Sequence, residues 1–253
     1  MNNSSLWQDA IRRLLQNKAA IFGGVVIIIM STLAIFAPFV APYSYEFQFV
    51  DRIGQPPSAE HWLGTDSLGR DLLSRIIYGA RVSLMVGFVA TTVALLIGVS
   101  WGVIAGYSGG RVDSIMMRIV DILYGLPFII FIILLMVIFG RNIFLLFAAI
   151  GAVEWLTMSR IVRAQVITLK NQEFVQAAQA MGVSNFAMFR RHILPNILGP
   201  IAVYATLTIP SVMLLESFLS FLGLGVPAEM SSWGSLIKDC LLYTSDAADE
   251  RLS

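Results

Sequence analysis

The sequence predicts an all-α fold in which several helices cross a membrane. Of its 253 residues, 57% are hydrophobic and only 13% are charged. The mean hydropathy is +0.77, which excludes an ordinary soluble domain. Long stretches without Asp, Glu, Lys or Arg recur along the chain, and a helix needs about 20 apolar residues to cross the bilayer core. These stretches predict five spans, near residues 20–41, 82–106, 120–140, 142–159 and 197–216.

Residues 1–18 precede the first span and predict an amphipathic helix that lies on the membrane surface. The apolar residues of this leader recur at helical spacing, with charged residues on the other faces; they are Leu6, Trp7, Ala10, Ile11, Leu14 and Leu15. A frayed polar leader is the alternative. A cleaved secretory signal fits less well, because the apolar run of the first span is too long and four more spans follow.

The longest loop, residues 42–80, lies between the first two spans. Asp66 or Ser67 is placed to cap a helix, and Gly79 to allow a turn into the second span. The helix between them would present one apolar face, formed by Leu72, Leu73, Ile76 and Ile77. This segment is either a binding surface or a packing helix that lies on the membrane.

Ionisable residues in or near the spans need partners, because a charge at mid-bilayer costs about 2.5–3.5 kcal/mol even on lenient scales. We expect Glu154 to pair with Arg160 or to reach the interface, with a gating or substrate contact as the alternative. Arg118 and Asp121 are three residues apart and can pair along one helix. Glu216 is expected at the outer end of the fifth span, capping a pathway or lying among headgroups.

Composition gives little sign of a metal, catalytic or nucleic-acid site. The net charge is only +1, and the single cysteine, Cys240, permits no internal disulfide. His61 and His192 are far apart in the sequence, so each is expected at a surface or interface rather than as a metal ligand.

The stretch Glu173–Asn196 is polar and basic, and it lies between two apolar runs. Gly182 can end a first helix in the left-handed conformation, Ser184 can cap a second helix, and Pro195 marks the next boundary. This pattern predicts a helical hairpin on which another protein docks; an ordinary connecting hairpin is the alternative. If the N-terminus is cytoplasmic, ten basic residues fall on that side and six on the other, which places the hairpin inside.

This stretch resembles the EAA loop of ABC importer permeases, whose consensus is EAA, three residues, Gly, nine residues and I-x-L-P. The consensus positions are held by Gln176, Ala177, Ala178, Gly182, Leu194 and Pro195. Gln176 replaces the usual Glu, and His192 stands in place of Ile. A charged contact that the family's Glu makes would therefore be altered, and Glu173, one turn earlier, is placed to take part of that role.

Other segments resemble the second permease subunit of peptide-type importers, the dipeptide, oligopeptide and nickel group. They are HWLGTDSLGRDLLSRIIYGARVSL, AGYSGGRVDSIMMRIVDIL, SRIVRAQVITLKNQEFVQAAQAMG, and ESFLSFLGLG with SSWG. The resemblance covers about Ser5 to Asp239, and the leader looks closest to oligopeptide importers. It implies a type I permease domain over residues 19–239, with a coupling loop at 160–196, in the bacterial inner membrane. It does not decide between oligopeptide, dipeptide and nickel.

The resemblance also implies a complex. A second permease, two ATP-binding subunits and a periplasmic or extracellular substrate-binding protein would be the partners, and transport would follow alternating access. ATP and Mg would be bound by the partner ATPases, because the sequence contains no G-x-x-x-x-G-K-[ST] motif. We therefore predict a transport subunit, not an enzyme. A secondary transporter or channel is the alternative; a membrane enzyme would need a His, Asp or Ser constellation that is not visible.

The family has a sixth span after SSWG, so this chain is expected to hold five of six spans and to be C-terminally truncated. Residues 240–253 resemble nothing in the family. We expect them to be a non-native tail, with a natural divergent tail as the alternative.

Overall fold

A computed structural model of the chain describes residues 14–140, 142–226 and 230–241. The regular structure of this described part consists of helices and includes no strand, which confirms the all-α prediction. The amphipathic helix expected in the leader falls mainly on residues 1–13, and most of the expected tail falls on residues 242–253, so these parts lie outside the described residues.

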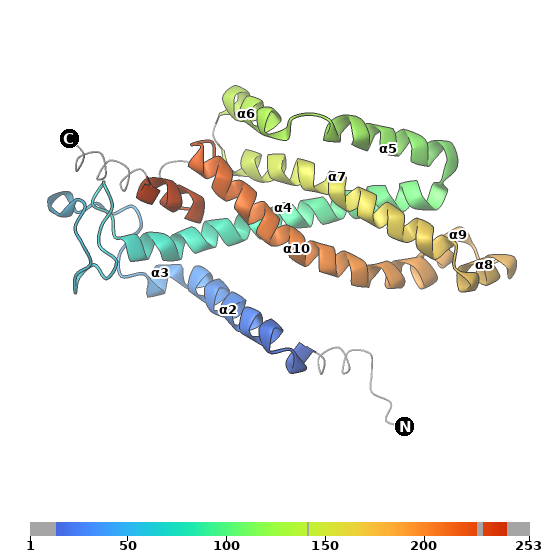
Figure 1. Ribbon diagram of the computed structural model, residues 1–253, viewed down its shortest axis with the longest axis horizontal. Helices are drawn as coiled ribbons and strands as arrows, with labels where there is room; N and C mark the ends of the chain where they lie inside the picture. The colour runs from blue at the N-terminus through green and yellow to red at the C-terminus, as the bar shows by residue number, and fades with distance from the viewer. Residues whose placement is uncertain (1–13, 141, 227–229, 242–253) are drawn as a thin grey trace.

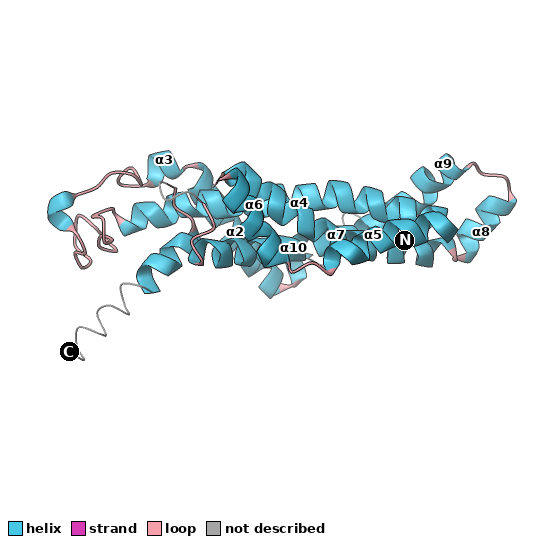
Figure 2. Ribbon diagram, turned by 90° about the horizontal axis from the view of Figure 1, so that it is seen from above, coloured by secondary structure: helices cyan, strands magenta, loops and turns pink. Residues whose placement is uncertain are grey.

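The helices run nearly along one long axis (Figures 1 and 2). In chain order they are α2 (Lys18–Ile35), α3 (Ala37–Val40), η1 (Val50–Arg52), α4 (Leu72–Ser108), α5 (Gly110–Tyr124), α6 (Phe128–Phe139), α7 (Ile143–Lys170), α8 (Glu173–Ala180), α9 (Asn185–Met188), the π-helix η2 (Phe189–Ile193) and α10 (Leu194–Phe221). Residues 233–241 form a further helix. Among the described residues, four helical runs are long and apolar enough to cross a membrane, and the bent pair α5–α6 makes a fifth candidate.

The third span, predicted near residues 120–140, is formed by two helices with a bend between them. α5 and α6 meet at an angle of 75°, and the break falls at Gly125–Pro127. Pro127 has no N–H to continue the helix, and its ring disfavours the helical conformation at Leu126. Most of the 15 residues of α5 lie before the start of the predicted span.

The second span also differs from its prediction, because α4 is one continuous helix from Leu72. Its N-cap is Asp71, whose carboxylate accepts a hydrogen bond from the Ser74 N–H at 2.8 Å, not Asp66 or Ser67. Gly79 makes no turn. It lies within the helix, where an added Cβ would approach the Ser232 carbonyl carbon to 3.3 Å, so its small size serves close packing.

A stripe of glycines brings α4 and α7 into close contact. A Cβ on Gly102 would lie 2.5 Å from the Ser159 carbonyl oxygen, and one on Gly98 would lie 2.7 Å from the Met158 Cβ. Gly106 continues the stripe one turn later. Small residues four apart let membrane helices approach closely, so that van der Waals contact replaces the missing hydrophobic drive.

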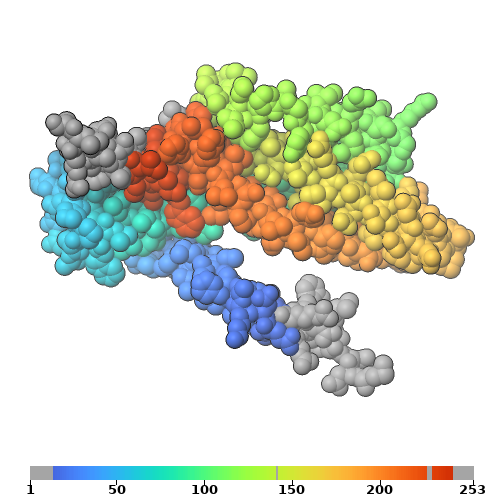
Figure 3. Space-filling view, viewed as in Figure 1, coloured from blue at the N-terminus to red at the C-terminus, as the bar shows by residue number. Residues whose placement is uncertain are grey.

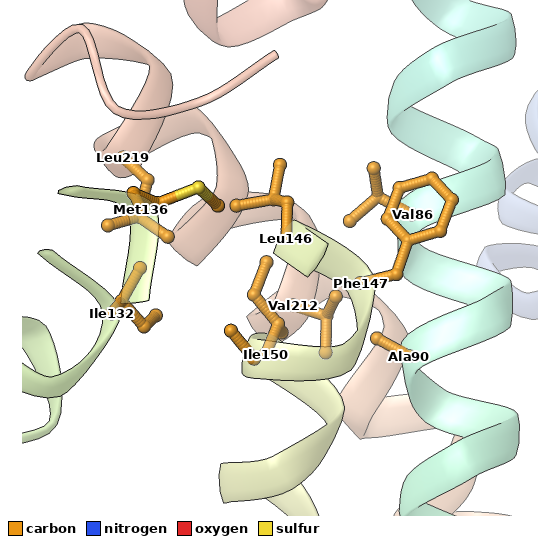
Figure 4. Close-up of a cluster of buried hydrophobic side chains, with 10 residues drawn as sticks. Val86, Ala90, Ile132, Met136, Leu146, Phe147, Ile150, Val212 and Leu219 are labelled. Atoms are coloured by element: carbon orange, nitrogen blue, oxygen red, sulfur yellow. The ribbon is translucent and has the colours of Figure 1, made fainter. Parts of the chain in front are cut away.

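Closer to the N-terminal end of α4 than the glycine stripe, α4, α6, α7 and α10 share an apolar core (Figure 4). Its labelled side chains are Val86, Ala90, Ile132, Met136, Leu146, Phe147, Ile150, Val212 and Leu219. By contrast, only 6% of α2 is buried, and Figure 3 shows α2 diverging from α10 with open space between them.

The ion pairs expected within single helices, Arg118 with Asp121 and Glu154 with Arg160, do not form. One ion pair between two helices forms in their place. Asp121 on α5 pairs with Arg160 on α7 at 2.8 Å, not with Arg118. Glu154 is half-buried and makes no ion pair with Arg160 or with any other described residue. Sequence spacing reveals only partners on the same helix, whereas the packing of α5 against α7 supplies a better one.

The loop between α3 and α4 folds around a buried histidine, contrary to the expectation that His61 lies at a surface. Its Nδ1 lies 2.9 Å from Asp71 Oδ1, and its ring packs against Tyr43 and Phe49 with centroids 5.2 and 4.8 Å away. His192 is only half-buried, as expected for an interface.

Asp66 forms the centre of a second buried polar group in this loop. Arg70 Nε and Arg75 Nη1 donate to its carboxylate at 2.8 and 2.5 Å, and Arg75 also reaches Asp239 at 3.1 Å. Burial alone would raise the pKa of Asp66, but N–H groups of Arg70 and Leu68 and the Arg70 guanidinium donate to the carboxylate and hold that pKa below its ordinary value.

Candidate functional site

The hairpin predicted from the polar stretch lies at one end of the long axis, and the α3–α4 loop lies at the other (Figures 1 and 2). Its first helix, α8, ends in two reverse hydrogen bonds. The Val183 N–H donates to the Ala178 carbonyl at 3.2 Å, and the Gly182 N–H donates to the Gln179 carbonyl at 3.0 Å. Gly182 has φ +79°, the left-handed conformation that this termination requires. The prediction that Gly182 ends the first helix in the left-handed conformation is confirmed.

The second helix starts at the predicted cap but does not end at the predicted boundary. The Ser184 hydroxyl accepts a hydrogen bond from the Ala187 N–H at 3.4 Å. The helical run then continues through the π-helix into α10 without a break at Pro195, which lies in the first turn of α10. In a regular α-helix the Pro195 ring would clash with the carbonyl four residues earlier, and the wider turn of Phe189–Ile193 accommodates it there.

Apolar side chains anchor the base of the hairpin to the bundle. Four of them are fully or almost fully buried against Val162 and Val166 of α7: Val175, Ala178, Met188 and Ile193. One polar contact reinforces this anchor, because the Tyr107 hydroxyl on α4 donates to Asn185 Oδ1 at 2.9 Å. Lys170 Nζ at the end of α7 donates to the Tyr107 carbonyl at 2.7 Å and so joins α7 to α4 at this point. A displacement of the hairpin would therefore act directly on α4 and α7.

The opposite face of the hairpin is exposed and partly apolar. Phe186 is 72% exposed and Met181 is 77% exposed, and Phe174 also reaches the surface. These three residues were missed in the analysis of the sequence, although the signal was present, since large apolar residues in a polar segment outside the spans suggest a contact surface.

The seven residues predicted to form the docking site fall into two groups. Five are exposed: Glu173, Gln176, Ala177, Gly182 and Pro195. Ala178 is only 3% exposed and Leu194 is half-buried, and both belong to the apolar anchor. The structure thus separates residues that a partner can touch from residues that hold the hairpin in place.

Gln176, which stands where the EAA consensus has Glu, makes a contact that a carboxylate cannot make. Its Nε2 donates to the Asn171 carbonyl at 3.3 Å. The amide therefore ties the exposed face of α8 back to the end of α7, and Glu173 is the acidic residue in the first turn of this helix.

Comparison with known proteins gives a consistent result. Residues 98–243 match the family described as "binding-protein-dependent transport system inner membrane component", and residues 5–57 match the "N-terminal TM domain of oligopeptide transport permease C". The dipeptide transport system permease protein DppC of Bacillus subtilis is 47% identical over 237 residues, which cover 94% of this chain and 74% of that protein.

Oligopeptide permeases are similar to a comparable degree. The oligopeptide transport system permease protein OppC of Escherichia coli strain K12 is 49% identical over 237 residues, covering 93% of this chain and 78% of that protein. OppC of Bacillus subtilis is 46% identical, covering 94% and 78%.

Proposed function

This chain belongs to the family of binding-protein-dependent transport system inner membrane components, and on that premise we propose that it is a permease subunit of an ATP-driven importer of peptides. The names of its relatives refer to dipeptide and oligopeptide transport, which supports peptides as the class of substrate. The permease domain would comprise residues 19–239, with the coupling loop at 160–196.

The hairpin carries the proposal. Its base is built into α4 and α7, while its outer face offers the exposed apolar side chains Phe174, Met181 and Phe186. A short helix that presents such a face fits a groove on a partner protein. We assign docking on an ATP-binding subunit to Glu173, Gln176 and Ala177 together with Phe174 and Met181.

The remaining predicted residues would support docking indirectly. Gly182 forms the turn between the helices, Ala178 and Leu194 hold the hairpin against the bundle, and Pro195 begins the following span. Closure of two ATP-binding subunits upon ATP binding would carry the hairpin with it, and α4 and α7 would follow. This rocking would open the pathway alternately to the two sides, a rigid-body form of alternating access.

The assembly would lie in the bacterial inner membrane with a cytoplasmic N-terminus. A second permease would complete the pathway, and a periplasmic or extracellular binding protein would deliver the peptide on the side of the α3–α4 loop. ATP and Mg would be held by the ATP-binding subunits. The exposed apolar faces of α2 and α10 would contact lipid and the second permease.

Site-specific cross-linking tests the proposed docking surface. In a background with Cys240→Ser, Met181→Cys carries a photoreactive maleimide in the assembled complex. Leu68→Cys is the matched control, since it is also an exposed apolar residue but lies in the α3–α4 loop at the other end. We expect Met181→Cys to cross-link to an ATP-binding subunit and Leu68→Cys not to. Equal cross-linking from both positions, or none from Met181→Cys in a complex that co-purifies intact, would contradict the assignment.

A further inference from the structure

Glu216, expected at the outer end of the fifth span either capping a pathway or lying among headgroups, is fully buried with 0% of its surface exposed, which excludes the headgroup alternative. A carboxylate in this position is costly unless hydrogen bonds compensate it. Ser220, one turn later on α10, donates to Glu216 Oε1 at 2.6 Å. Ser83, on α4, donates to Glu216 Oε2 at 3.4 Å. Both oxygens of the carboxylate are thus bound by hydroxyl groups from two different helices.

Each hydroxyl group also accepts a hydrogen bond from residues 231–235. Ser83 Oγ accepts from the Trp233 N–H at 3.2 Å, and Ser220 Oγ accepts from the Ser232 hydroxyl at 3.4 Å. Two chains of hydrogen bonds therefore start in this segment and converge on the Glu216 carboxylate. We call the four side chains Ser83, Glu216, Ser220 and Ser232 the serine network.

The segment 231–235 is pressed closely onto both helices. A Cβ on Gly234 would come within 2.4 Å of the Ser217 Cα on α10. On the side of α4, the Ser231 hydroxyl donates to the Arg75 carbonyl at 3.0 Å and Trp233 Nε1 donates to the Ile76 carbonyl at 3.2 Å. The segment thus joins the first turns of α4 to the last turns of α10, at the end of the bundle remote from the hairpin.

We propose that Glu216 is a positioning residue that holds this end of the bundle closed, and that its bond to Ser83 breaks when the end opens. The proposal rests on the alternating access of the proposed function, in which the end remote from the hairpin admits the substrate. Ser220 lies on the same helix as Glu216 and moves with it. Ser83 lies on α4 and makes the longer of the two bonds, so separation of α4 from α10 breaks that link first.

Accessibility of a single cysteine tests the proposal. Ser231 is buried and is not a member of the serine network, so Ser231→Cys in the Cys240→Ser background reports whether the segment is covered. The complex is placed in lipid nanodiscs and treated with a polar maleimide that does not enter the bilayer. We expect slow labelling of the resting complex, and labelling at least tenfold faster when a non-hydrolysable ATP analogue is added.

Variants of the network distinguish positioning from a general effect on packing. Glu216→Gln should label at least tenfold faster without nucleotide and should lose the response to the analogue. Glu154→Gln is the matched control, the same chemical change at a half-buried position outside the network, and should label like the parent. Ser83→Ala removes the bond to Glu216 together with the acceptor of the Trp233 N–H, keeps the Ser220 bond, and should label several-fold faster.

Parent-like labelling of Glu216→Gln or of Ser83→Ala would overturn the proposal, as would labelling of the parent that does not respond to the analogue. If Glu216→Gln does not assemble, Ser83→Ala decides. Co-purification of the ATP-binding subunits monitors the proposed function separately, and labelling of the permease without nucleotide tests the network even if those subunits do not bind.

Discussion

Gly102 offers a quantitative test of the close contact between α4 and α7. In Gly102→Ala the new Cβ would lie 2.5 Å from the Ser159 carbonyl oxygen, whereas ordinary van der Waals contact begins at 3.4 Å. The obstructing atom is backbone, so no change of rotamer relieves the contact, and the two helices must separate by roughly 0.9 Å, the difference between those distances. Overpacking of this kind costs about 1–3 kcal/mol.

Gly23→Ala is the matched control. Gly23 lies within α2 and has nothing within 4 Å of an added Cβ, so both variants gain the same helix propensity, about 0.5–1 kcal/mol, and only Gly102→Ala meets a steric cost. With about 2–4 °C of melting temperature per kcal/mol for a chain of this size, Gly102→Ala should melt about 2–12 °C below the control.

The assay is thermal unfolding of the detergent-solubilised protein, followed by the fraction that remains monodisperse after heating. A Gly102→Ala protein that melts at the temperature of the Gly23→Ala control would refute the reasoning. It would show that the two helices can separate at this point without loss, and that the glycine stripe does not determine their distance.

Three further outcomes are expected. Ala178→Asp buries a carboxylate in the anchor of the hairpin, so it should lower the melting temperature and abolish co-purification of the ATP-binding subunits. Ala177→Asp, on the exposed face, should weaken that co-purification without lowering the melting temperature. Glu173→Gln should reduce ATP-binding-subunit co-purification, and adding Gln176→Glu should restore it; a double variant as weak as the single one would contradict a shared acidic role. Asp66→Asn should destabilise the protein by about 3–5 kcal/mol at neutral pH, because it removes the counter-charge of the buried Arg70 guanidinium and leaves Arg75 with Asp239 alone. Folding lowers the pKa of the Asp66 carboxyl below its ordinary value of 3.8, so this stabilisation is complete above that pH and is lost as the pH falls through the folded value. The melting temperatures of the two proteins should therefore converge in acid, and a gap that widens in acid would contradict this sign.

Local signals explain what the sequence predicted correctly. Spans follow from hydropathy, which needs no knowledge of neighbours, and the hairpin follows from the chemistry of Gly182 and Ser184. The bend before α6 carried an equally local signal at Pro127, but the unbroken apolar run masked it. Gly79 shows the reverse error, because a residue that often ends helices is retained inside α4 by its contact with residues 231–235.

The contacts that the sequence did not predict are made between residues far apart in the chain. Glu216 is bound by Ser83, which lies 133 residues earlier in the chain, and Asp121 is bound by Arg160 on another helix. No periodicity connects such residues, so spacing suggested only partners on the same helix. The exposed apolar residues of the hairpin were accessible to sequence reasoning, whereas the separation of Ala178 from Ala177 required the packing. Their roles in docking stay predictions.

The glycine stripe has a mechanical consequence. Helices whose backbones are in contact cannot move apart without losing that contact along the whole stripe. We therefore expect α4 and α7 to move as one rigid body, with the hairpin attached at one end. The 37 residues of α4 make this rigid body about 55 Å long at 1.5 Å per residue. A tilt of about 5° around the hairpin end would then move the far end by about 5 Å over that length. On the proposed function, a small rotation imposed at the hairpin would therefore open the other end of the bundle by about that distance.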